Sequence, residues 1–305
     1  MAMDGETFDY GLDPGEPFIP EDIDDADVSA PHIMTVLGPV LPGALGVTNA
    51  STVLTGLEKP QDDALLAELE EAGFAGIGAF VSSDLISSAQ DLAPLRWLAE
   101  RSNQHVIYGY TVPALPDFES EMQAAIEVVK NGLGEEASRP GFLSTNWDQL
   151  SVATVAREAT GIPVVVDLGE LEIGMLMTTA PDELDGVIAR ITGAVNEEQL
   201  IELAEAGAFL LIDQIHGDVE QDRSAARLIA GLAKAGYLQS LLLGYHPHSA
   251  PESVSYGVGS RWSYLIEQFP LLVLDAGLDA MAMRTILIEN PNEAFTIHPP
   301  QAIDE

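Results

Sequence analysis

The chain has 305 residues, 47% of them hydrophobic, and 12 Lys and Arg against 49 Asp and Glu give it a formal net charge of −37. This charge excludes nucleic acid and anionic membranes as default partners, because both repel an acidic surface. The lack of cysteine excludes disulfides, thiolate metal sites and cysteine nucleophiles.

No apolar run reaches the ~20 residues of a membrane span, and the first residues lack a basic segment followed by an apolar one. We therefore expect a cytoplasmic protein. Lysine occurs only at Lys59, Lys130 and Lys234. Abundant acids, few lysines and an ordinary core favour a halophilic protein, because in molar salt a Debye length of ~3 Å screens self-repulsion. An acidic protein from a low-salt cell is the alternative.

Residues 1–30 are rich in Asp, Glu, Pro and Gly and show no hydrophobic period, so we expect a flexible acidic arm before a single domain over residues 31–305. In that domain, apolar runs typical of buried strands alternate with helical patterns. The strand-like runs cover residues 34–40, 44–48, 75–81, 105–112, 141–144, 162–168, 186–191, 208–215 and 238–245. The helical patterns cover residues 60–72, 84–101, 118–131, 147–160, 196–206, 220–235, 259–274 and 278–289.

About eight strand–helix units result from this alternation. Buried parallel strands separated by helices predict an α/β fold, and eight units favour a closed (β/α)8 TIM barrel over an open doubly wound sheet. An open sheet normally carries a phosphate-binding loop after an early strand. The glycines of residues 73–78 lack the dinucleotide order, and neither GxxxxGK[ST] nor GxSxG occurs.

Several short stretches resemble the phosphotriesterase family of the amidohydrolase superfamily. Residues 35–39 (TVLGP) and 45–48 (LGVT) are similar to the opening of that family. Residues 235–237 (AGY), 256–257 (YG) and 286–291 (ILIENP) are similar to the approach to its eighth strand and to its closing helices. The resemblance covers about residues 34–295. It implies a (β/α)8 barrel, metal-dependent hydrolysis and a homodimer.

The metal ligands of that family have no matching residues here. The resemblance implies a His-x-His after the first strand, a carboxylated Lys or a Glu on the fourth, histidines on the fifth and sixth, and an Asp on the eighth. The six positions are occupied by Ser51, Val53, Ser144, Asp167, Ile191 and His246. Zinc and similar ions need deprotonated N, O or S donors, so we expect the binuclear site to be absent and no cofactor to be bound.

Asp213 matches an Asp on the seventh strand of the family. Together with Asp167 and His246 it could form a relocated site for one divalent metal, zinc or manganese. A hydrogen-bonded polar cluster at the barrel mouth is the alternative that we favour. A loop HxH such as His246-Pro-His248 is more often structural. Further polar residues expected at the strand ends are Asn49, Tyr110, Asn146, Glu170 and His216.

Three functions remain open. Loss of the ligands favours a catalytically silent scaffold or regulatory subunit, in a homo-oligomer such as a dimer or in a complex with another protein. A metal-dependent hydrolase of phosphoesters or lactones that uses the relocated site is the second. A small-molecule binding protein is the third, with aromatic walls at the mouth, although such aromatics are more typical of a core. The candidate wall residues are Tyr108, Tyr110, Trp147 and Tyr245.

Overall fold

The computed structural model of the chain describes residues 29–54, 63–179, 184–191, 193, 195–247 and 261–300. The acidic arm expected over residues 1–30 lies, apart from its last two residues, outside the described part. Within that part, no helix is long and apolar enough to cross a membrane.

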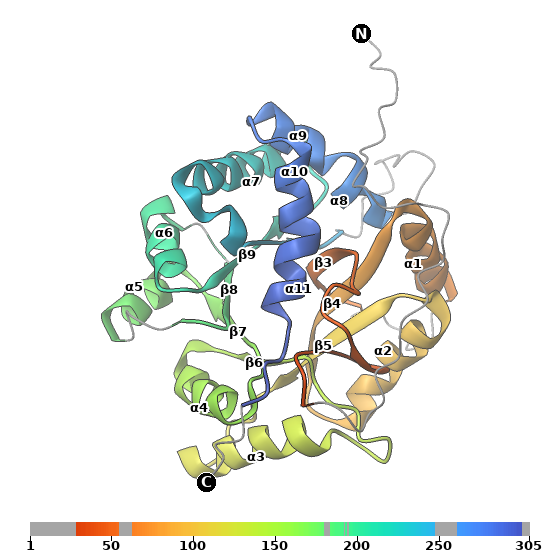
Figure 1. Ribbon diagram of the computed structural model, residues 1–305, viewed down its shortest axis with the longest axis vertical. Coiled ribbons are helices and arrows are strands. Elements are labelled where there is room, and N and C mark those ends of the chain that lie inside the picture. Colours follow the sequence, from red (N-terminus) through yellow and green to blue (C-terminus); the bar gives the residue numbers. More distant parts are fainter. Residues whose placement is uncertain are drawn as a thin grey trace.

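Eight parallel strands follow one another around a single sheet in chain order, which confirms the predicted (β/α)8 TIM barrel (Figure 1). The strands are β3 (Val47–Thr52), β4 (Ile77–Ile86), β5 (His105–Thr111), β6 (Phe142–Thr145), β7 (Val164–Leu168), β8 (Val187–Ile191), β9 (Phe209–Ile215) and β10 (Leu241–Tyr245).

Helices surround this barrel, and Figure 1 shows those from α1 to α9 around its outside and α10 and α11 in front of it. They are α1 (Asp63–Ala75), α2 (Ala89–Ser102), α3 (Phe118–Asn131), α4 (Leu150–Thr160), α5 (Glu170–Thr179), α6 (Glu197–Glu205), α7 (Val219–Leu232), α8 (Tyr264–Glu267), α9 (Phe269–Asp275), α10 (Ala280–Arg284) and α11 (Asn290–Ala294). Helix α5 was not predicted. Its sequence, ELEIGMLMTT, spreads apolar residues around the helix, so no amphipathic period marks it.

The loops that lead from strands into helices end in residues that cap the helices. Ser88 starts α2 in a capping box with Asp91, and Asp117 caps α3. Asn196 and Asp218 do the same for α6 and α7. Each side chain accepts a hydrogen bond from a first-turn N–H that has no partner within the helix. An acid-rich sequence thus fixes where the helices begin, beside the carboxyl ends of the strands.

The strands bury both of their faces, as their continuous apolar runs predict. On β7, Val164 and Val166 belong to the core between barrel and helices, whereas Val165 belongs to the core inside the barrel. The inner core is an apolar layer, which we call the floor. Its strand residues are Ala50, Ala79, Val81, Ile107, Phe142, Val165, Ile188, Leu211 and Leu242.

The amino-terminal end of the barrel is closed by segments from both ends of the domain. A hairpin of β1 (Ile33–Thr35) and β2 (Gly38–Val40) contributes Ile33 and Val40 to the floor cluster. Phe295, just after α11, packs on Phe142 with the ring centroids 5.8 Å apart. Figure 1 shows α10 and α11 crossing in front of the barrel on this side. Any ligand must therefore enter from the opposite, carboxyl end of the strands.

The barrel closes between β10 and β3 through a side chain. Strands β10 and β3 lie against each other. Among the described residues, however, they are the first and last strands of the hydrogen-bonded sheet, and no backbone ladder joins them. The buried amide of Asn49 bridges them: its Nδ2 donates to the carbonyl oxygen of Tyr245 at 3.0 Å, and its Oδ1 accepts from the Tyr245 N–H at 2.9 Å. Asn49, expected among the residues of the mouth, thus completes the backbone pairing of the barrel.

Candidate functional site at the barrel mouth

Polar side chains lie immediately above the floor, two residues further along the same strands. Val165 is followed by Asp167 on β7, Ile188 by Arg190 on β8, and Leu211 by Asp213 on β9. Because side chains alternate across a strand, residues two apart point to the same side. The strands therefore present an inner layer of three charged groups at their carboxyl ends.

Strands β10 and β3 complete this layer. The inward position on β10 is Gly244, where a Cβ would fall on the carboxylate of Asp213 and on the Cβ of Ser51. Glycine therefore leaves the space that the Asp213 side chain fills. His246 follows β10, and Ser51 lies near the end of β3. Asp167, Arg190, Asp213, His246 and Ser51 are called the mouth cluster below.

Asp213 is the centre of the contacts on one side of the cluster. Its Oδ1 is hydrogen-bonded to Nε2 of His246, and its Oδ2 accepts from Oγ of Ser51 at 3.2 Å. Oγ of Ser51 is also 3.4 Å from the same Nε2. A Ser-His-Asp relay needs serine and aspartate on different ring nitrogens. Here both approach Nε2, so the three side chains form a polar cluster that lacks the geometry of a catalytic triad.

Arg190 joins the two carboxylates of the cluster. Its Nε and Nη2 donate to the two oxygens of Asp167 at 2.5 and 2.7 Å, and its Nε is 3.9 Å from Oδ2 of Asp213. The Arg190 side chain is 15% exposed and that of Asp213 11%, against 43% for Asp167. Burial alone would lower the pKa of Arg190, but the hydrogen bonds and charge of Asp167, with the charge of Asp213, raise it above its ordinary value. A permanent positive charge therefore stands between two carboxylates.

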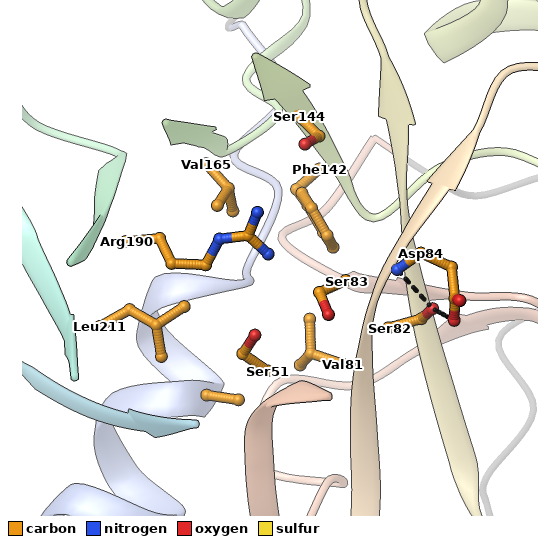
Figure 2. A pocket seen from close by; sticks show the side chains of 11 residues that line it. Ser51, Val81, Ser82, Ser83, Asp84, Phe142, Ser144, Val165, Arg190 and Leu211 are labelled. Carbon is orange, nitrogen blue, oxygen red and sulfur yellow. Dashed lines mark hydrogen bonds between the residues drawn. The ribbon is translucent and has the colours of Figure 1, made fainter. Parts of the chain in front are cut away.

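A small cavity lies beside the guanidinium. Figure 2 shows Arg190 reaching toward Phe142 and Ser83 from one wall, with Ser144 near the opposite end. The cavity measures about 10 Å³, which is roughly the space that one water molecule needs. The hydroxyl of Ser83 is buried and has no hydrogen-bond partner among the described residues. The described mouth is thus polar and nearly filled at its base.

The residues at the positions of the family's metal ligands do not fit a binuclear metal centre. Ser51 is engaged with Asp213, Val53 is an aliphatic side chain that is about half exposed, and Ser144 is a neutral hydroxyl on the cavity wall. Ile191 packs in the outer core, whereas its neighbour Arg190 faces inward. Of the six positions, only those of Asp167 and His246 offer an anionic oxygen or a nitrogen ligand, and the inward residue on β8 is a cation.

The three donors of the relocated site are only partly together. Asp213 and His246 are in contact, but Arg190 stands between Asp213 and Asp167. Across the described part of the chain, no three His, Asp or Glu side chains form a group that could hold a metal ion. His248 lies outside the described residues.

The aromatic side chains proposed as a wall of the mouth lie elsewhere. Tyr108, Tyr110 and Tyr245 are buried in the outer core, and Trp147 packs against it. The three tyrosines lie on strands and Trp147 begins a short 3-10 helix, and all four pack with the outer core, outside the inner layer of the mouth. His216 serves through its backbone N–H, which donates to Asp222 on α7.

Arg190 and Ser83 are the residues that sequence analysis missed. Arg190 is two residues after Ile188, which gives it the inward direction that the alternation of a strand predicts. The resemblance drew attention to Ile191 instead. Ser83 lies in the long strand β4, which ends at Ile86, whereas the predicted strand ended at Val81, two residues before Ser83.

Comparisons with known proteins agree with this fold. The model of the phosphotriesterase family matches residues 121–295. N-acetyltaurine hydrolase of Bos taurus is 22% identical over 273 residues, covering 77% of this chain and 78% of the bovine one. An amidohydrolase from Mycoplasma synoviae superposes with a TM-score of 0.69 at 16% identity, over 91% of this chain and 95% of the other. A mutant organophosphorus hydrolase from Deinococcus radiodurans superposes with a TM-score of 0.66 at 17% identity, over 86% of this chain and 97% of the other.

Proposed function

The chain belongs to the phosphotriesterase family, and we propose that it is a member that has lost metal-dependent hydrolysis and acts as a scaffold or regulatory subunit. The observation that carries this proposal is the position of Arg190. Its guanidinium lies 3.9 Å from Asp213 and is doubly hydrogen-bonded to Asp167, where a hydrolase of the family would gather anionic and imidazole ligands around metal.

The charge balance of the mouth supports the same proposal. Divalent metals bind where carboxylates and neutral imidazoles supply electron pairs to one point. Here the carboxylate oxygens of Asp167 are used by Arg190, and those of Asp213 by Ser51 and His246. An incoming metal ion would have to displace these partners and approach a fixed positive charge.

The cavity at Arg190 is too small for most ligands, because it measures about 10 Å³ among the described residues, whereas ligand pockets usually measure about 300–1,000 Å³. A larger hollow of about 460 Å³ is lined by residues in or just after β8 and β9 and in α7, among them Gln214, His216 and Gln221. The surface is strongly acidic, with a net charge of −37. A protein partner or a second copy of the chain therefore fits better than nucleic acid or an anionic membrane.

The decisive experiment measures metal content and mass in solution on protein purified without chelator in molar KCl. We expect substoichiometric zinc, manganese and cobalt, and a mass above that of one chain. A screen of lactones, phosphoesters and N-acyl amides with each metal added should give no hydrolysis above background. One metal ion per chain together with hydrolysis would overturn the proposal, and a monomer that captures no partner at high salt would remove the scaffold role.

A hydrolase with a relocated mononuclear site is the second candidate. The contact between Asp213 and His246 favours it, because these are two sound donors already side by side. The hydrolases among the similar proteins favour it as well. In that case activity should depend on added metal and disappear in Asp213→Asn.

A further inference from the structure

Four neighbouring strands, at or just after their carboxyl ends, carry a row of side chains in which carboxylates alternate with basic groups. Asp167 on β7 pairs in register with Arg190 on β8, Arg190 lies next to Asp213 on β9, and Asp213 is hydrogen-bonded to His246 after β10. Each member thus contacts the next. The row is acid, base, acid and imidazole, all on one side of the barrel mouth.

The middle of this row requires a cation. Asp167 and Asp213 carry like charges on the two strands that flank β8, and a positive charge between them offsets their repulsion. Asp213 is 11% exposed and Arg190 15%, so water screens this pair only weakly. A guanidinium meets the requirement with a single charge, and its planar fork matches the two oxygens of Asp167.

We propose that Arg190 is the built-in cation of the mouth, and that its guanidinium keeps Asp167, Asp213 and His246 from forming a divalent metal site. This inference rests on the proposed function, which states that the natural protein holds no catalytic metal. It adds that, among the donors that remain, a single side chain prevents metal binding. Two carboxylates and an imidazole are a donor set that suits zinc, cobalt or manganese once the competing charge is gone.

Arg190→His is the variant that tests the proposal, because it removes the charge and adds an imidazole to the row. The row then offers four donors from four successive strands. Chelator-treated protein in molar KCl is titrated with Co²⁺, whose visible spectrum reports ligand number and geometry. We expect about one cobalt ion per chain, with a rise in the unfolding temperature on addition of the metal.

Two matched variants separate charge from donors. Arg190→Lys keeps a cation but not the bidentate fork, and it should bind no more cobalt than the natural protein. Arg190→His combined with Asp213→Asn keeps the new imidazole but weakens the central ligand, and it should lose the cobalt spectrum. Cobalt binding by Arg190→Lys would contradict the assignment of charge as the cause.

The outcomes distinguish this inference from the proposed function. Stoichiometric metal in the natural protein overturns both. If neither the natural protein nor folded Arg190→His binds cobalt, the inference is wrong while the proposed function stands. If Arg190→His does not fold without metal, refolding is repeated with Co²⁺ present. Recovery of the far-ultraviolet circular dichroism signal then supports the inference, and its continued loss overturns it.

Discussion

The floor and the mouth of the barrel are built from the same strands, two residues apart. Val165, Ile188 and Leu211 form a dry apolar layer, and Asp167, Arg190 and Asp213 follow them as a charged one. The floor resists change because close packing makes every lost methylene costly. The mouth is held by ion pairs and hydrogen bonds between side chains of neighbouring strands. Its stability therefore depends on charge and on the presence of each partner, and that of the floor on packed volume.

Removing a large side chain from the floor should have the greatest effect. Phe295 is fully buried and packs on Phe142. Phe295→Ala should lower the free energy of unfolding by about 3–5 kcal/mol, because it removes apolar contacts and leaves a cavity. Urea unfolding in molar KCl measures the loss. Phe74→Ala is the matched control on α1, where the side chain is 90% exposed, and it should change stability by less than about 0.5 kcal/mol.

Opening the seam between β10 and β3 should have the second largest effect. Asn49→Ala leaves the N–H and C=O of Tyr245 without the amide that bonds both. A buried group that loses a hydrogen-bond partner costs about 1–3 kcal/mol, so the loss of these two bonds should cost at least about 2 kcal/mol in urea unfolding. Asn131→Ala, at the exposed end of α3, is the control. Equal effects at the two positions would mean that the seam is held by other contacts.

The barrel strands were predictable from the sequence, and Ser51, Asp167, Asp213 and His246 were expected at their ends, but Arg190 and the role of Asn49 were not. Strands buried on both faces produce continuous apolar runs such as residues 162–168, and eight of these between helical patterns indicate the barrel. The face of a strand on which a side chain lies is harder to predict, because a shift of one residue moves every side chain to the opposite face. That shift separates Ile191 in the outer core from Arg190 at the mouth. Asn49 bonds a residue 196 positions away, which no local pattern reveals.

A buried acid just outside the barrel should give a smaller, pH-dependent effect. Asp222 on α7 accepts from the N–H groups of His216 and Gly217 in the loop after β9. Burial raises the pKa of Asp222 above its ordinary value, although the hydrogen bonds from this loop oppose the rise. A raised pKa in the folded state means that this group stabilises the fold fully below the pKa of the unfolded chain, and that its contribution is lost as the pH rises through the folded pKa.

Asp222→Asn tests that sign. The asparagine does not titrate, so the free energy of unfolding of the natural protein minus that of the variant should fall as the pH rises through the acid range. Urea unfolding of both proteins, measured at several pH values at constant KCl, gives this difference, and groups common to both cancel. A difference that grows with pH would show that the loop N–H groups stabilise the carboxylate more than burial penalises it.

The two serines of the mouth should show the smallest effects, and the contrast between them tests the description of the cavity. Ser51→Ala removes a hydroxyl that donates to the carboxylate of Asp213, and about 1–2 kcal/mol should be lost. Ser83→Ala removes a buried hydroxyl that has no partner among the described residues, so stability should stay within about 0.5 kcal/mol or rise. A loss at Ser83 as large as that at Ser51 would reveal an ordered water bonded in the cavity beside Arg190. The base of the mouth would then be a hydrated polar site, and its hydrogen bonds as well as its charges would hold it together.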